Sequence, residues 1–133
     1  MTVSELKYLL LVEDLSKERA NSGAEGEPGA KMSEISARSS LSRPSVFNAM
    51  NRLERNGYIT KQKLISLTSA GEKALLEYRE IIGWLCRHLT EHCHVPQEIA
   101  YADALGCACA FSDSSRENLA EFIRAQKNYA KTV

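Results

Sequence analysis

The sequence lacks a long apolar run. No uninterrupted apolar segment approaches the ~20 residues that a membrane-spanning helix requires. Near the N-terminus the longest apolar run covers residues 9–12, which is too short for the apolar core of a signal peptide. We therefore expect a cytoplasmic protein with no membrane partner.

The sequence also has few cysteines and no recognisable catalytic pattern. Its four cysteines lie between residues 86 and 109, and a disulfide framework is not expected in the cytoplasm. The chain shows no glycine-rich phosphate loop, no paired acidic motif, and no nucleophile with a base and an orienting residue. A chain of 133 residues can bury one core but has little room for a separate catalytic domain. We expect that the protein is not an enzyme.

The balanced charge of the chain conceals a basic segment, defined here as residues 38–63. The whole sequence has 17 basic and 17 acidic residues, but this segment has six basic residues against one acidic residue, Glu54. Its net charge is therefore +5, and the rest of the chain carries −5. Such clustering is typical of a surface that binds a polyanion; the alternative is a solvated basic face without a partner.

The first third of the chain predicts two helices separated by a loop. Thr2 and Glu5 have the spacing of a capping box, at the start of a helix that runs to about Lys17. The glycine-rich segment 21–29 predicts a flexible surface loop within the domain. A short helix at residues 32–39 follows, and then a tight turn.

The next segment, residues 42–57, predicts a helix with both ends marked. Ser42 can cap it, Pro44 is tolerated in the first turn, and Gly57 suits the left-handed residue past the end. Its inward stripe consists of Val46, Ala49, Met50 and Leu53.

The second half of the chain predicts a hairpin and three helices. Residues 58–67 contain enough strand-forming residues for a two-stranded hairpin. The helices are expected at residues 72–93, 96–111 and 114–126. Ser114 and Glu117 match a second capping box.

This order of elements is that of a winged helix-turn-helix, in a mainly α fold with a small β-hairpin wing. A helix can enter the major groove of DNA, where residues near its N-terminus meet the base edges. Arg43 can pair with guanine and Asn48 with adenine. The candidate DNA-binding residues are Ser42, Arg43, Pro44, Ser45, Asn48 and Arg52 on the helix, and Lys61, Gln62 and Lys63 at the wing tip.

The segment 42–59, Ser-Arg-Pro-Ser-Val-Phe-Asn-Ala-Met-Asn-Arg-Leu-Glu-Arg-Asn-Gly-Tyr-Ile, is followed by Leu67-Thr-Ser-Ala-Gly71. Together they resemble the diphtheria-toxin-repressor and manganese-regulator family, and the likeness continues without a gap to Asp113. The resemblance implies a metal-dependent homodimeric repressor of the short type, which dimerises through the helices after the wing. We expect a DNA-binding domain at residues 1–70 and a helical dimerisation region at residues 71–133. Exposed apolar residues on the helix at 96–111 also favour a homodimer, namely Ile99, Leu105 and Phe111.

The metal ligands that the resemblance implies are largely missing. In the family's register the primary positions hold Lys7, Leu10, Ile82, Leu105, Ala108 and Cys109, and the ancillary positions hold Ile82, Cys86 and Tyr101. Of these, only Cys86 and Cys109 can bind a soft metal. A packed core without metal is expected there. Lys7 either supplies permanently the charge of the absent ion, with Asp103 as a partner, or lies in solvent.

A second metal hypothesis concerns residues 86–94, which contain two cysteines and three histidines as potential ligands. His88 and His92 are four residues apart and can share an ion such as zinc. The alternative is that the histidines interact with the negative end of a helix and that Cys86 and Cys93 lie in the core. The cofactor is thus unknown: none, or a transition metal such as zinc.

These observations predict a homodimeric, sequence-specific regulator of transcription that binds double-stranded DNA, acts as a repressor, and has lost or rewired the usual metal site. Two alternatives belong to other classes. One is a winged-helix regulator of the multidrug-resistance-repressor type that senses a thiol reagent or a small ligand. The other is a protein-interaction module with no DNA target.

Overall fold

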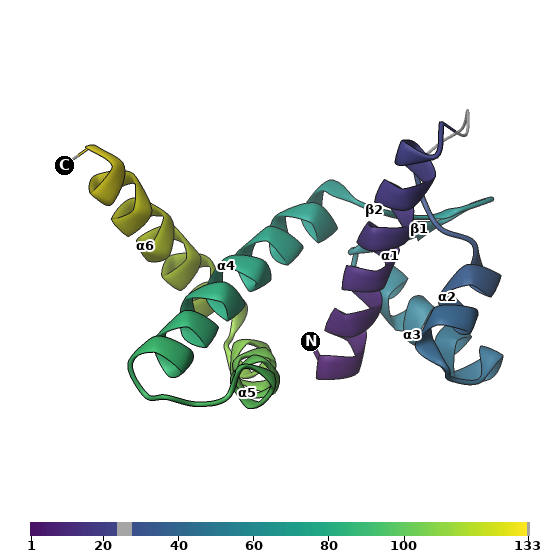
Figure 1. Ribbon diagram of the computed structural model, residues 1–133. Coiled ribbons are helices and arrows are strands. Elements are labelled where there is room, and N and C mark those ends of the chain that lie inside the picture. Colours follow the sequence, from purple (N-terminus) through teal and green to yellow (C-terminus); the bar gives the residue numbers. More distant parts are fainter. Residues whose placement is uncertain (24–27, 133) are drawn as a thin grey trace. The chain divides into compact units, whose positions relative to one another are not determined.

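A computed structural model describes residues 1–23 and 28–132, and these form two compact units. The N-terminal unit is Thr2–Leu75, and the C-terminal unit begins at Leu76. The first contains α1 (Val3–Asn21), α2 (Met32–Ser39), α3 (Arg43–Arg55), β1 (Ile59–Lys61) and β2 (Ile65–Leu67) (Figure 1). The second contains most of α4 (Ser69–Glu91), together with α5 (Gln97–Ala110) and α6 (Asp113–Thr132). The predicted fold class, mainly helical with one small hairpin, is confirmed.

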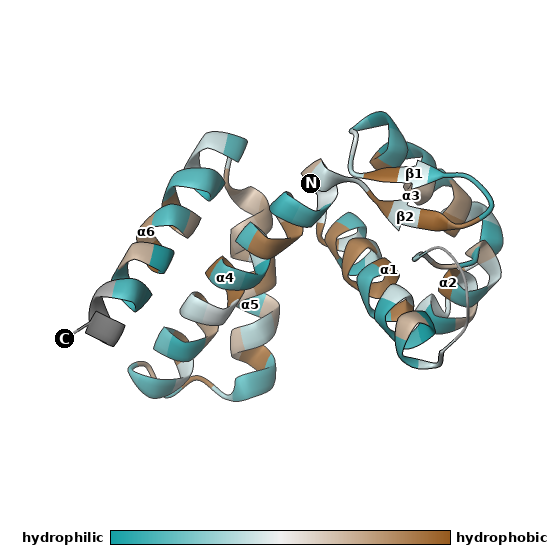
Figure 2. Ribbon diagram, turned by 90° about the horizontal axis from the view of Figure 1, so that it is seen from above, coloured by the Kyte–Doolittle hydropathy of each residue, from teal (hydrophilic) through white to brown (hydrophobic). Residues whose placement is uncertain are grey.

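Helix α1 forms the centre of the N-terminal unit. The predicted capping box is present: the Thr2 hydroxyl accepts a bond from the Glu5 N–H at 3.1 Å, and the Glu5 carboxylate accepts one from the Thr2 N–H. The helix continues four residues beyond the predicted end. Leu6, Leu9 and Val12 are completely buried. Helices α2 and α3 and strand β2 all contact α1, and the hydrophobic turns of α1 and the strands are brown in Figure 2.

Both predicted ends of α3 are found. The Ser42 hydroxyl accepts a hydrogen bond from the Ser45 N–H at 3.3 Å, and Gly57 has φ +83°, in the left-handed region that favours glycine. The predicted inward stripe is buried against the unit's core, with at most 1% exposure for Val46, Ala49, Met50 and Leu53. Burial of this stripe fixes which side of α3 faces solvent.

The wing is the antiparallel pair β1–β2, in which Ile59 is opposite Leu67 and Lys61 is opposite Ile65. A third segment joins the outer edge of β2, because Ala30 and Ile65 exchange two backbone hydrogen bonds of 2.9 and 2.8 Å. The predicted loop at 21–29 leads into this segment, but residues 24–27 lie outside the described part of the chain.

The Leu-Thr-x-x-Gly motif forms the junction between the wing and α4. The Thr68 hydroxyl donates to the Gly57 carbonyl at 2.6 Å and accepts from the Gly71 N–H at 3.0 Å, so α4 starts at Ser69 instead of the predicted residue 72. Gly71 is buried against the backbone of Tyr58, and a Cβ added there would collide with the Tyr58 carbonyl oxygen. The motif therefore holds the start of α4 against the residues that follow α3.

The C-terminal unit packs α4, α5 and α6 around small side chains. Ala100, Ala104 and Ala108 form a buried stripe on α5. Leu105 is also buried, at 2% exposure, so its predicted exposure is wrong; Ile99 is exposed as predicted. None of the described helices is long and apolar enough to cross a membrane.

Two other sequence predictions for this unit are wrong. Helix α6 begins at Asp113 because the Ser112 hydroxyl accepts a bond from the Ser115 N–H at 3.2 Å, so the cap is Ser112 and not Ser114. Cys93 is exposed, because α4 ends at Glu91 and the chain turns away from the helical stripe before reaching Cys93. The turn includes His94, with φ 56°.

A buried ion pair connects α4 to α6. Arg116, only 5% exposed, donates to the Glu77 carboxylate at 3.1 Å and to the Tyr78 hydroxyl at 3.3 Å. A third bond reaches Asp113 at 2.9 Å. These partners satisfy a charge that would otherwise be costly in the interior.

We expect Gly71→Ala to destabilise the protein by about 1–3 kcal/mol, because the added methyl group must displace backbone rather than a flexible side chain. Gly83→Ala is the matched control: Gly83 is also in α4, and a Cβ there points into open space. That substitution should leave stability unchanged or raise it by up to about 1 kcal/mol. Urea unfolding of the three proteins measures both effects, and equal stability of the two variants would contradict the close contact at Gly71.

Candidate nucleic-acid interface

The N-terminal residues of α3 form an exposed polar surface. Ser42, Arg43, Pro44, Ser45 and Asn48 are all exposed. The Ser42 hydroxyl donates to the Ser45 hydroxyl at 2.9 Å, which holds the first turn closed. Arg43 and Asn48 are separated by about 140° around the helix, so they point to different parts of this surface.

Arg52 is the one predicted contact residue on α3 that interacts with another helix. Its Nε donates to Glu5 Oε1 at 3.2 Å, and the Glu5 side chain is only 8% exposed. Close to half of the Arg52 side chain still faces solvent. The bond connects one flank of α3 to the start of α1, and it also neutralises the buried Glu5.

Lys61 is not a free cation at the wing tip. Its ammonium group donates to the Asn51 side-chain carbonyl, lies 3.8 Å from the Glu54 carboxylate, and is 4.9 Å from the centre of the Phe47 ring. The side chain is only 22% exposed. Lys61 therefore folds back onto α3, whereas Gln62 and Lys63 are exposed.

Sequence reasoning missed the two exposed apolar residues on this surface. Leu41 is 52% exposed in the turn before α3, and Phe47 is 51% exposed on α3 itself. The helical period already placed Phe47 outside the buried stripe, and this was the available signal.

Arg38, at the start of the basic segment, is paired elsewhere. It donates to Glu18 of α1 at 2.7 Å, and this hydrogen bond raises the pKa of Arg38. The other exposed basic residues of α3 and the wing tip are Arg43, Arg52, Arg55 and Lys63.

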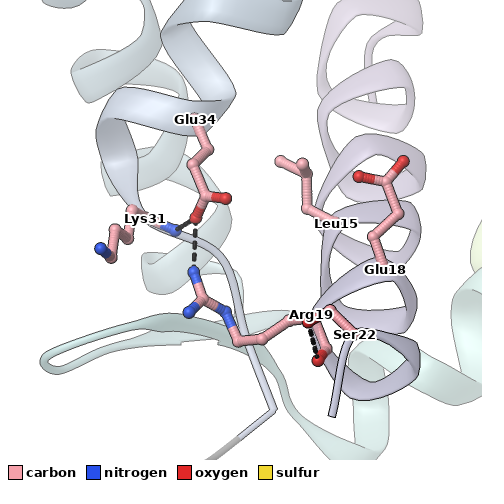
Figure 3. A pocket seen from close by; sticks show the side chains of 6 residues that line it. All are labelled: Leu15, Glu18, Arg19, Ser22, Lys31 and Glu34. Carbon is pink, nitrogen blue, oxygen red and sulfur yellow. Dashed lines mark hydrogen bonds and ion pairs between the residues drawn. The ribbon is translucent and has the colours of Figure 1, made fainter. Parts of the chain in front are cut away.

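A polar pocket of about 340 Å³ lies between the end of α1 and the start of α2 (Figure 3). Arg19 donates to Glu34 at 2.6 Å and to the Gly29 carbonyl at 3.1 Å. Glu34 also accepts from the Lys31 N–H at 2.9 Å, and this hydrogen bond together with the Arg19 guanidinium lowers the pKa of the Glu34 carboxyl. Arg19 and Glu34 thus have hydrogen-bond partners within the pocket. These bonds connect α1 to residues 29–34.

Of the weak metal candidates, the structure brings His88 and His92 together as a pair. Cys86 is buried and accepts a hydrogen bond from Gln97 at 3.6 Å, and Cys109 is half-buried. The rings of His88 and His92 are stacked with centroids 5.1 Å apart, and Trp84 contacts His88 edge-on. Across residues 1–23 and 28–132, no group of three or more His, Cys, Asp or Glu side chains could hold a metal ion.

Three of the positions that the resemblance assigns to metal ligands hold buried apolar residues. Ile82, Leu105 and Ala108 are buried in the C-terminal unit. They offer no donor atoms, so they do not fit a transition metal. Lys7, in the N-terminal unit, is exposed, which agrees with the interpretation that its side chain lies in solvent.

Comparisons with known proteins agree with this architecture. The IclR helix-turn-helix domain family matches residues 24–63. No match was found among proteins of curated function. A hypothetical protein from Sulfolobus solfataricus has a similar structure, with 18% identity over 92% of this chain and 89% of that one, and a TM-score of 0.66.

Two solved regulators are also similar. The metal-dependent transcriptional regulator MtsR shares 17% identity over 93% of this chain and 55% of its own, with a TM-score of 0.63. The manganese-activated repressor ScaR, in its apo form, shares 22% identity over 84% of this chain and 53% of its own, with a TM-score of 0.53. This chain thus spans about half the length of these two regulators. The chain has the winged-helix fold. By their descriptions, one of the two named neighbours is a transcriptional regulator and the other is a repressor.

The different settings of Lys61 and Lys63 predict different effects on binding to duplex DNA. Lys63→Ala should flatten the dependence of log affinity on log salt by up to about one unit, because one phosphate contact is lost. Lys61→Ala should weaken binding with the salt dependence unchanged, because the Lys61 ammonium already interacts with Asn51 and Glu54 of α3 and makes no phosphate contact. Fluorescence anisotropy at several salt concentrations measures both slopes, and an equal loss of slope in the two variants would contradict the assignment.

Proposed function

We propose that the protein is a homodimeric, sequence-specific DNA-binding regulator of transcription that acts as a repressor. The observation that carries the proposal is the surface of α3, where Arg43 and Asn48 are exposed beside a wing whose tip presents Gln62 and Lys63. The buried stripe on the opposite side of α3 holds this surface outward. A helix with that exposure fits the width of the major groove.

The proposed contacts divide into two kinds. Arg43 reads guanine through its O6 and N7 atoms, and Asn48 reads adenine through its N6 and N7 atoms. The phosphate backbone is contacted by Ser42, Ser45 and the half-exposed side chain of Arg52. Pro44 packs against the same backbone. Gln62 and Lys63 contact a phosphate or the adjacent minor groove.

The C-terminal unit supports the proposed dimer. Four large apolar side chains on its three helices are about half exposed, namely Leu76, Ile99, Tyr101 and Phe122. A second copy of the same surface would remove them from water. Two α3 helices would then read half-sites about one DNA turn, ~34 Å, apart. In this proposal residues 1–70 bind DNA and residues 71–133 dimerise.

The proposal departs from the named neighbours in its metal requirement. Buried Ile82, Leu105 and Ala108 cannot ligate the ion, so a manganese-type switch is lost. The rewired alternative is a zinc ion at Cys86 and Cys109 or at His88 and His92. A second candidate function is thiol sensing, which the exposed Cys93 and Cys107 favour.

The DNA-binding proposal is tested by selecting duplexes from a randomised library at low salt. The wild-type protein should enrich a two-fold symmetric sequence, because two equivalent helices read it. Arg43→Ala should relax the choice at one position of each half-site and cost about 1–3 kcal/mol there. Arg79→Ala, an exposed arginine of α4, is the control that should leave the selected sequence unchanged. If wild-type protein binds no better than a neutral protein, the proposed function is wrong.

The metal claim is tested by measuring affinity for the selected duplex with manganese, iron, zinc, chelator or oxidant. We expect a dimer by sedimentation in every sample, and no activation by micromolar manganese or iron, because the ligand positions are apolar. Activation by either ion would contradict the lost switch, and a monomer would contradict the dimer. Zinc dependence abolished by Cys86→Ala or His88→Ala would support the rewired site, while release by oxidant alone would support thiol sensing.

A further inference from the structure

Phe47 is an aromatic side chain in an otherwise polar part of the α3 surface. Its side chain is 51% exposed. It is not part of the buried stripe by which α3 packs against the core of the unit. At 100° per residue, Phe47 lies about 40° from Arg43 and about 40° from Asn51 around the helix. Its ring therefore stands on the solvent face of α3, on the flank that faces the wing.

The ring is held in place on one side. The Lys61 ammonium lies 4.9 Å from the centre of the Phe47 ring, and Lys61 is itself bound by Asn51 and is 3.8 Å from Glu54. A cation at this distance is attracted to the face of an aromatic ring. Three side chains thus orient the ring, Lys61 of β1 directly and Asn51 and Glu54 of α3 through Lys61, while half of the ring's surface remains open.

The surroundings restrict what can cover this open surface. An apolar protein partner would have to bury the neighbouring charged side chain of Arg43, which is exposed. Duplex DNA neutralises that charge, and its major groove contains one apolar group, the C5-methyl of thymine. Among the side chains that contact this methyl in known complexes is phenylalanine.

We propose that Phe47 contacts the C5-methyl of a thymine in the major groove and determines the preference for thymine at that position. This inference rests on the proposed function, because it requires α3 in the major groove. It adds a base that the hydrogen-bonding side chains do not read: Arg43 is suited to guanine and Asn48 to adenine, and neither detects a methyl group. Lys61 is the positioning residue that holds the ring.

The test uses the duplex that the full-length protein selects, with each thymine replaced in turn by deoxyuridine. This change removes only the methyl group. Wild-type protein should lose about fourfold in affinity at one position in each half-site, which is the effect expected for one buried methyl-sized group. Phe47→Ala should bind more weakly and show no loss at that position, with its salt dependence unchanged.

Lys63→Ala is the control, because it should change the salt dependence and not the effect of the methyl group. It should keep the fourfold loss on methyl removal while its salt dependence flattens, because it removes a phosphate contact and leaves the ring in place. Lys61→Met should reduce the loss on methyl removal, because the ring is then no longer oriented. Thermal unfolding checks that Phe47→Ala, which changes an exposed side chain, remains folded.

Three results would overturn the inference and leave the proposed function standing. One is a protein that binds its site with equal affinity for thymine and deoxyuridine throughout. Another is an equal loss in wild-type and Phe47→Ala, which would show that the methyl group acts through the DNA alone. The third is a selected half-site with no thymine. A protein that binds no duplex would instead overturn the proposed function, and this inference with it.

Discussion

Burial of one apolar stripe on α3 determines which side chains of this helix are exposed to solvent. Val46, Ala49, Met50 and Leu53 face the core that α1 and α2 provide, and each is almost completely removed from water. A helix held by four such residues cannot rotate by even one position, because a turn of about 100° would expose the stripe and bury polar side chains. The outward direction of Arg43, Phe47 and Asn48 follows from this packing.

Two contacts then fix the flanks of the same helix. On one side Arg52 is bonded to the buried carboxylate of Glu5, which also caps α1. On the other side Lys61 is bonded to Asn51 and faces the ring of Phe47. Both basic residues were expected from sequence to serve DNA, but the structure shows that each also holds an element against α3. The position of the wing relative to the helix thus depends on a side chain of the wing itself.

Local signals in the sequence were sufficient to predict much of this arrangement. The capping pair Thr2 and Glu5, the Ser42 cap and Gly57 are set by residues within a few positions of each other, and all are found as predicted. The direction in which Lys61 folds could not be predicted, because it depends on contacts between β1 and residues of the preceding helix α3, about ten positions earlier in the chain. Cys93 and Ser114 were assigned wrongly for a related reason. A helix end shifted by two residues moves a side chain out of its stripe or gives the cap to a neighbour.

The chain shares its fold with the metal-dependent transcriptional regulator MtsR, although buried apolar residues stand at three of the positions that the family resemblance assigns to ligands. Ile82, Leu105 and Ala108 are buried and offer no donor atoms to an ion. Since α3 and the wing are both part of the N-terminal unit, we propose that this unit alone recognises DNA. The most direct measurement is an NMR titration of the full-length protein with its selected duplex, following the backbone amides. Recognition of DNA by the N-terminal unit predicts the largest shifts at residues 42–48 and 62–63. Shifts confined to residues beyond 75 would contradict it.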